Sequence, residues 1–65
     1  MIMEKIAGKS AYTYILREGG KQIRYTIIYC QYFALSRYYH VDEYIEDLLE
    51  REMDKLKKTI IHYDT

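Results

Sequence analysis

The chain has 65 residues, ten basic and ten acidic side chains, 49% hydrophobic residues, one cysteine and no proline. This composition excludes an internal disulfide, and Cys30, His40 and His62 are too few and too scattered for a structural zinc site. We therefore expect a single domain over residues 1–65 that holds no metal and no cofactor.

The sequence also bears on location and assembly. No apolar run approaches the roughly 20 residues that span a bilayer, no signal-peptide h-region is present, and a lone reduced cysteine fits the cytoplasm. A domain of this size buries only about 60% of its unfolded surface. Because the domain has neither a disulfide nor a metal to stabilise it, self-association is the remaining source of stability, and we expect a homodimer.

The first clear element in the chain is a β-hairpin. Residues 1–9 fit either a short strand or a helical turn that ends at Gly8. Residues 11–17 and 22–33 are rich in tyrosine and β-branched residues, and Gly19-Gly20 between them suits a two-residue type I′ or II′ turn. That turn predicts the pairs Glu18–Lys21, Arg17–Gln22, Leu16–Ile23, Ile15–Arg24, Tyr14–Tyr25, Thr13–Thr26, Tyr12–Ile27 and Ala11–Ile28.

This register sorts the side chains of the hairpin onto two faces. The apolar face consists of Tyr12, Tyr14, Leu16, Ile23, Tyr25 and Ile27, and a slip of one residue would scramble it. The second strand is expected to continue through residues 29–35 and to pair with another segment or another chain. Cys30 would then lie in that strand, on the face of Arg24 and Thr26, as a half-buried structural cysteine.

Residues 41–58 predict an amphipathic helix. Its apolar stripe consists of Val41, Ile45, Leu48, Leu49, Met53 and Leu56. Acidic residues come early and Lys55, Lys57 and Lys58 come late, the order that the helix dipole favours. The helix begins either at a turn capped by Ser36 or near His40. Residues 59–63 favour a short strand over a continuation of the helix. The expected fold is α+β, with the order β-β-α-β or β-β-α.

Charge is distributed unevenly along the chain. Residues 1–40 carry six bases and two acids, whereas residues 41–65 carry four bases and eight acids, so the halves are +4 and −4. A basic sheet could neutralise an acidic helix, or one half could face a charged partner.

Catalytic patterns are missing from the sequence, so we expect no enzyme. Gly19-Gly20 lacks a phosphate-binding pattern, and the carboxylates of the helix belong to one solvated face. The histidines have no acid or nucleophile at a spacing that suggests a triad. The chain resembles, in build alone, the small accessory proteins of phages and mobile elements, which often inhibit or regulate a host enzyme.

Nine tyrosines and the acidic helix point to protein binding. Tyrosines in a connection are typical of interfaces, and an acidic helix can occupy a phosphate-binding surface of a partner. The expected contact residues are Tyr38, Tyr39, Asp42, Glu43, Glu46, Asp47 and Glu50. The alternative is a small dimeric nucleic-acid-binding regulator that uses a basic hairpin face of Arg17, Lys21 and Arg24.

Overall fold

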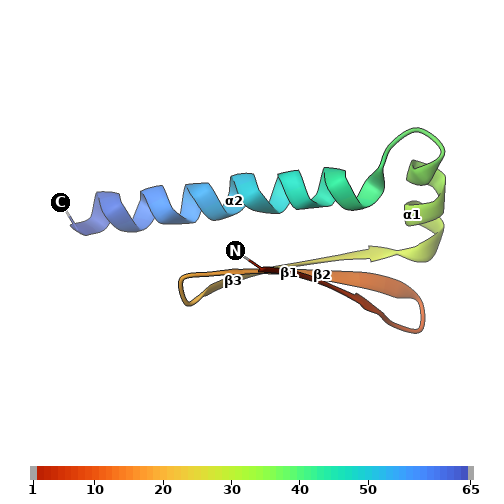
Figure 1. Ribbon diagram of the computed structural model, residues 1–65, viewed down its shortest axis with the longest axis horizontal. Helices are drawn as coiled ribbons and strands as arrows, with labels where there is room; N and C mark the ends of the chain where they lie inside the picture. The colour runs from red at the N-terminus through yellow and green to blue at the C-terminus, as the bar shows by residue number, and fades with distance from the viewer. Residues whose placement is uncertain (1, 65) are drawn as a thin grey trace.

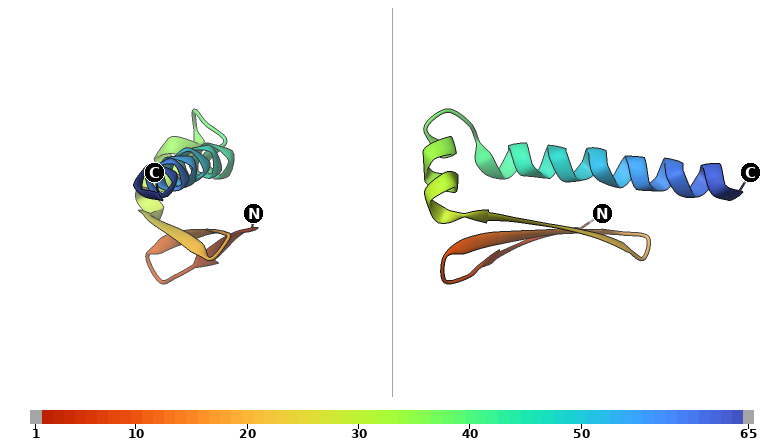
Figure 2. Two further views of the ribbon diagram at one scale, coloured as in Figure 1. Left: turned by 90° about the vertical axis from the view of Figure 1, so that its left-hand side faces the viewer. Right: turned by 180° about the vertical axis from the view of Figure 1, so that it is seen from behind.

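The structure is a computed structural model that describes residues 2–64, with the side chains of residues 2–57. Three strands, β1 (Ile2–Ala7), β2 (Ala11–Glu18) and β3 (Lys21–Ile28), precede two helices, α1 (Tyr29–Ser36) and α2 (Val41–Asp64). The strands form an antiparallel sheet in the order β1-β2-β3. Helix α2 lies across one face of the sheet, and α1 stands at one end and joins the two layers (Figures 1 and 2). The fold is α+β, as the sequence predicts.

The hairpin of β2 and β3 has the predicted register, because all eight expected pairs, from Glu18↔Lys21 to Ala11↔Ile28, are formed. Both turn residues have positive φ, 58° at Gly19 and 80° at Gly20, as a type I′ turn requires. The twist of such a turn matches that of the strands, so the two glycines fix which side chains face the helix.

The third strand comes from the N-terminus and the order is β-β-β-α-α, so both expected orders, β-β-α-β and β-β-α, are wrong. Strand β1 pairs with β2 from Ile2↔Arg17 to Ala7↔Tyr12, whereas residues 59–63 belong to α2. A connection of only three residues joins β1 to β2, and the Gly8 amide donates to the Ala11 carbonyl at 2.8 Å. Closing so short a loop costs little entropy. A C-terminal strand would first have to leave a helix that already satisfies its backbone.

Helix α1 replaces the strand expected over residues 29–35. Strand β2 begins at Ala11, which pairs with Ile28, so β2 offers no backbone partner beyond Ile28. A helix satisfies its own amides and carbonyls, and the chain turns into one at that point. The Tyr29 amide donates to the Ser10 carbonyl at 3.0 Å, and its hydroxyl donates to the Gly8 carbonyl. Cys30 therefore lies exposed on α1, and its expected half-buried place in a strand is wrong.

The core lies between α2 and the predicted apolar face of the hairpin. Each of its side chains is at most 4% exposed, and they are Tyr14, Leu16, Ile27, Val41, Ile45, Leu49 and Met53. Leu48 is half-buried and Leu56 is 42% exposed, so these two lie at the edge of the predicted stripe. The buried helix positions repeat every four residues, which lays them along one slowly drifting line.

Helix α2 begins at Val41, the second of the two expected starts, with Asp42 and Glu43 in its first turn. Ser36 instead ends α1, where its hydroxyl donates to the Phe33 carbonyl at 2.7 Å. Because α2 runs on to Asp64, Lys55, Lys57 and Lys58 lie before its last turn, contrary to expectation. Its C-terminal part extends past the β2–β3 turn (Figure 1).

Candidate interaction surface at the helix elbow

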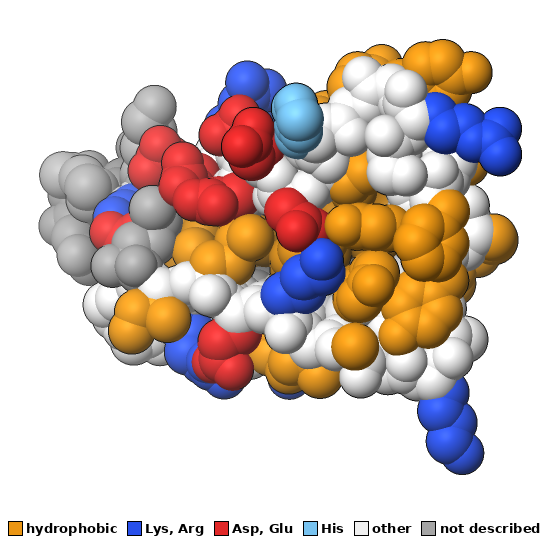
Figure 3. Space-filling model, turned by 45° about the vertical axis from the view of Figure 1, so that its right-hand side comes forward, with side chains coloured by type: hydrophobic (Ala, Val, Ile, Leu, Met, Phe, Trp, Pro, Cys, Tyr) orange, Lys and Arg blue, Asp and Glu red, His pale blue; other side chains and the backbone are white. Residues whose placement is uncertain are grey.

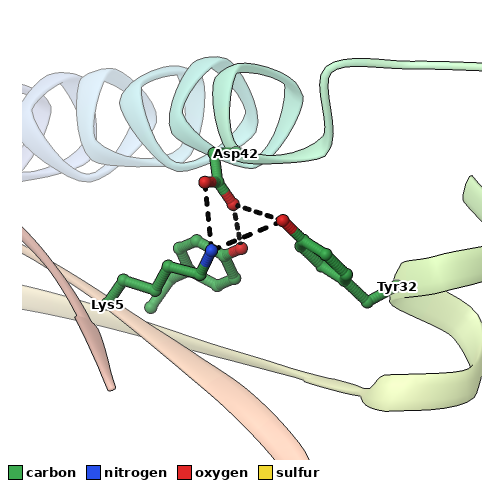
Figure 4. A network of polar contacts seen from close by, with 4 residues as sticks. Lys5, Tyr32 and Asp42 are labelled. Carbon is green, nitrogen blue, oxygen red and sulfur yellow. Dashed lines mark hydrogen bonds and ion pairs between the residues drawn. The ribbon is translucent and has the colours of Figure 1, made fainter. Parts of the chain in front are cut away.

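A cluster of four polar side chains connects both helices to the sheet (Figure 4). Lys5 from β1 donates to Asp42 Oδ2 of α2 at 3.0 Å. Tyr14 from β2 donates to Asp42 Oδ1, and Tyr32 from α1 donates to the same oxygen at 3.4 Å. Lys5 Nζ also lies 3.4 Å from the Tyr32 hydroxyl. Asp42 therefore links one residue from each of three other elements to the first turn of α2.

Tyrosine rings surround the ammonium group of Lys5. Its Nζ lies 4.3 Å from the ring centroid of Tyr12, 5.0 Å from that of Tyr32 and 5.8 Å from that of Tyr14. Each distance is within the range at which the face of an aromatic ring attracts a cation. The alkyl stem of Lys5 lies on the helix side of an edge strand, and its charge is held by these rings and by Asp42.

The pKa values within this cluster follow from burial and hydrogen bonding. Burial acts to raise the pKa of Asp42, but hydrogen bonds from Tyr14 and Lys5 outweigh it and lower that pKa below its usual value. Burial likewise acts to lower the pKa of Lys5, but the contacts with Asp42 and Tyr32 raise it overall. Burial and the hydrogen bond to Asp42 both raise the pKa of Tyr14. All three groups therefore keep their neutral-pH protonation states over a wide pH range.

The contacts that join β1, β2 and α1 to α2 indicate a structural role for the cluster, and the pKa shifts agree with it. A lysine with a raised pKa is a poor base and nucleophile near pH 7, because so little of it is neutral. A phenol with a raised pKa is equally reluctant to lose its proton. The cluster holds α1, α2 and the sheet in one arrangement, and so determines the shape of the connection between the helices.

That connection, residues 37–40, forms the elbow between α1 and α2. The amides of Tyr38 and Tyr39 both donate to the Leu35 carbonyl at 2.9 Å, which turns the chain sharply after α1. The Tyr38 side chain is 79% exposed and that of Tyr39 is 57% exposed. The ring of Tyr39 lies 5.8 Å from the ring of Tyr44, itself mostly exposed on the first turns of α2. The elbow thus presents large rings to solvent, as the sequence predicts for Tyr38 and Tyr39.

Two hollows meet at Tyr39 and Val41. One is apolar, has a volume of about 280 Å³, and is completed by Tyr25, Leu35 and Tyr44. The other is more polar, has a volume of about 360 Å³, and is completed by Tyr32, Ser36, His40, Asp42 and Glu43. We call the two hollows and Tyr38 the elbow site. It offers an apolar recess and a polar recess, and Tyr39 lines both.

The predicted acidic residues take two different positions. Glu43, Glu46 and Asp47 are exposed and Glu50 is half-buried, and acidic side chains gather along α2 in the space-filling view (Figure 3). Asp42 instead turns toward the sheet, where Lys5, Tyr14 and Tyr32 engage it. We call Glu43, Glu46 and Asp47 the acidic face. It continues directly from the elbow site, because Glu43 belongs to both.

The structure distributes the three predicted basic residues over both faces of the hairpin. Arg17 and Arg24 share the face away from the helix, whereas Lys21 is paired with Glu18 on the helix side. Arg17 forms an ion pair with Glu4 and donates to Gln22 Oε1 at 3.3 Å. A continuous basic face of three residues is therefore not formed within this chain.

Sequence reasoning missed Lys5, Tyr25, Leu35 and Tyr44 as parts of these sites. Lys5 and Leu35 lie in elements that the sequence leaves open or assigns wrongly. Tyr25 could have been found, since the register places it beside Tyr14 at the outer strand of the hairpin. The sequence signal for Tyr44 is its position beside the apolar stripe of the helix.

Metal sites and membrane-spanning helices are absent from the described part of the chain. Among the described residues, no group of three or more His, Cys, Asp or Glu side chains is arranged to hold a metal ion. No helix in the described part of the chain combines the length and the apolar character needed to cross a membrane. The chain matches no protein-family model, and no curated protein or solved structure is significantly similar to it.

Proposed function

We propose that this chain is a cytoplasmic, non-enzymatic protein that binds another protein through the elbow site and the acidic face, and so inhibits or regulates it. The observation that carries the proposal is the continuity of exposed rings with exposed carboxylates. Tyr38, Tyr39 and Tyr44 are each more than half exposed, and Glu43 connects them to the acids of α2. Exposed aromatic residues around a recess are typical anchors of protein interfaces.

The chemistry of the site supports a partner with a particular kind of surface. The apolar recess suits an aliphatic or aromatic side chain of the partner, and the polar recess, which Glu43 lines, suits a lysine or arginine a few residues away. The acidic face extends this negative potential along α2. The complementary surface is therefore a basic one, such as the phosphate-binding surface of a nucleic-acid enzyme, which electrostatic attraction would also help the protein to find quickly.

The expected assembly is a homodimer, in which each copy presents its own elbow site. The cluster of Lys5, Tyr14, Tyr32 and Asp42 supports the proposal indirectly, because it attaches the first turn of α2 to α1 and to the sheet beside the elbow. A preorganised surface loses less conformational entropy on binding than a mobile one.

The test is affinity capture from the native host with matched variants. Tagged wild-type protein is compared with Tyr39→Ser and with a triple variant, Glu43→Gln, Glu46→Gln and Asp47→Asn, each checked for its fold by circular dichroism. A partner identified by mass spectrometry is then purified, and its affinity is measured. We expect Tyr39→Ser to weaken binding roughly thirtyfold and the triple variant roughly tenfold, with the latter effect reduced at high salt.

The control changes acids on the same helix outside the acidic face, Glu52→Gln with Asp54→Asn, and should bind like wild type. Nuclease treatment of the lysate separates protein partners from nucleic acid. Capture that depends on nucleic acid, or a partner that binds all variants equally, would refute the proposal. In the first case, loss of binding in Arg17→Ala with Arg24→Ala would point to the basic residues instead.

A further inference from the structure

The face of the sheet opposite α2 is uncovered in the described part of the chain (Figures 1 and 2). The strand register places Ile2, Ile6, Ile15 and Ile28 on this open face. Ile2, Ile6 and Ile28 are 64%, 47% and 45% exposed, whereas Ile15 on the central strand is only 4% exposed. Three large aliphatic side chains on one small sheet face form an apolar surface that water solvates poorly.

Polar side chains on the open face are largely paired with one another. Thr13 and Thr26 hydrogen-bond through their hydroxyls at 3.2 Å. Arg17 forms an ion pair with Glu4 and donates to Gln22. Covering groups that already have partners leaves few of them unsatisfied, so burial of this face carries a small desolvation cost.

We infer that a second copy of this chain covers the open face, so that two sheets pack face to face. This inference rests on the homodimer within the proposed function and assigns its seam. The chain exposes 5166 Å². A compact monomer of 7.9 kDa is expected to expose roughly 4,400 Å². The uncovered face of the sheet contributes to this excess, together with the overhang of α2 (Figure 1).

The open face is also large enough to form a small interface between two copies of the chain. Strands of this length, about 4.8 Å apart, give the sheet a footprint of about 350 Å². Side chains stand up from that plane, so two facing copies bury on the order of 1,000 Å² together, the lower end of specific interfaces. Packed sheets of this kind lie about 10 Å apart, with the side chains of the two inner faces interdigitated.

Charge on the open face is complementary to itself. Glu4, Ile15 and Arg24 form one row across the three strands, with the acid on β1 and the base on β3. A two-fold axis that runs along β2 brings the two copies of this row face to face and places Glu4 opposite Arg24 of the partner subunit. The Glu4 side chain remains 45% exposed in its ion pair with Arg17, so its carboxylate is open to that second guanidinium. The open face is therefore complementary to a second open face, as a two-fold interface requires, and this favours a second copy of the chain over an unrelated protein.

Sedimentation equilibrium tests the seam with full-length protein. Wild type should have twice the 7.9 kDa mass of the chain at about 50 μM, a concentration suited to a small interface. Ile6→Glu and Ile28→Glu should each sediment as folded monomers, since both side chains are exposed and support no core. Leu56→Glu is the matched control, because Leu56 has similar exposure, 42%, but lies on α2.

Charge variants test the arrangement within the seam. Arg24→Glu and Glu4→Arg should each raise the dissociation constant of the dimer roughly tenfold or more, and combining the two substitutions should recover most of the loss. A wild-type monomer at that concentration overturns the inference. A dimer that survives Ile6→Glu and Ile28→Glu but is lost in Leu56→Glu or Tyr39→Ser overturns it as well. The variants of the acidic face should remain dimeric, so failure of partner capture and failure of dimerisation are distinguishable.

Discussion

Asp42→Asn is the most direct test of the cluster that positions the elbow. The substitution keeps the shape of the side chain but removes the charge that accepts hydrogen bonds from Tyr14, Tyr32 and Lys5. Asparagine has only one side-chain oxygen. When that oxygen accepts from Tyr14, the amide nitrogen of Asn faces the ammonium group of Lys5, and two donors then oppose each other. The expected result is a less stable protein in which α1 and the start of α2 are held less firmly to the sheet.

The expected loss can be worked out from the burial of the partners. Hydrogen bonds to a charged group are worth about 1.5–3 kcal/mol, and an exposed ion pair contributes about 0–1 kcal/mol. Tyr14 is 0% exposed, which favours the upper part of the first range. The side chains of Asp42 and Lys5 are 51% and 34% exposed, so solvent screening reduces both contributions. We expect Asp42→Asn to lower the free energy of unfolding by about 1–2 kcal/mol at pH 7.

The pH dependence of this loss has a definite sign. The pKa of Asp42 is lowered from 3.8 in the folded protein, so the stability it contributes is present above that value and is lost as pH falls through the folded pKa. The pKa of Lys5 is raised from 10.5, so its contribution is lost only at more alkaline pH. The difference between wild type and variant should be constant near neutrality and should shrink as pH falls past 3.8.

Urea unfolding followed by circular dichroism at fixed protein concentration measures this difference. Glu43→Gln is the matched control, because Glu43 lies in the same first turn of α2 but faces solvent. It removes the interaction of a carboxylate with the helix dipole, about 0.3–1 kcal/mol, without touching the cluster. If both variants lose the same stability, or if the loss in Asp42→Asn is independent of pH, the cluster does not hold the elbow.

Two further predictions concern the core and the hairpin turn. Leu49→Ala should lower the free energy of unfolding by about 2–5 kcal/mol, because Leu49 is 1% exposed, whereas half-buried Leu48→Ala should cost much less. If thermal unfolding showed that Leu48→Ala is more destabilising than Leu49→Ala, the described packing of α2 would be contradicted. Gly20→Ala should cost about 1 kcal/mol, because its φ of 80° is unfavourable for an L side chain. An unchanged melting temperature would contradict this strain.

The predictable parts of the fold are those decided by local chemistry. Gly19-Gly20 sets the turn, and the turn sets a register that can be checked against the alternation of Tyr12, Tyr14 and Leu16. The helix from Val41 carries its own apolar period and its own acidic first turn. In each case the residues that decide the structure lie within a few positions of one another.

The parts that could not be predicted depend on distant partners. Residues 29–35 have the composition of a strand, but a strand needs a neighbour, and β2 begins opposite Ile28. Residues 59–63 are rich in β-branched and aromatic residues, yet they continue a helix already under way. The sequence groups Asp42 with the other acidic residues of the helix. Lys5 and Tyr32 turn it inward, and both lie in elements that the sequence leaves open or assigns wrongly.

The fold shows where the charges of the basic first part and the acidic second part of the chain lie. If the sheet simply neutralised the helix, its bases would face α2, as Lys5 does in its pair with Asp42. The pair Lys57–Glu18 has the opposite polarity, because its base lies on α2 and its acid on β2. Arg17 and Arg24, however, lie on the open face, on the far side of the sheet from the acidic face. Neutralisation across the sheet is therefore partial.

This separation of charge connects the two proposed surfaces. In the proposed dimer, both open faces are buried, and Arg17 and Arg24 are covered together with their acidic partners. The two copies of α2 then lie on opposite outer sides, and each presents a carboxylate surface and an elbow site. Such an assembly would repel phosphate and attract basic protein surfaces from two directions. It would bind two partner molecules at once, so a stoichiometry of two chains to two partners is expected wherever the partner is monomeric.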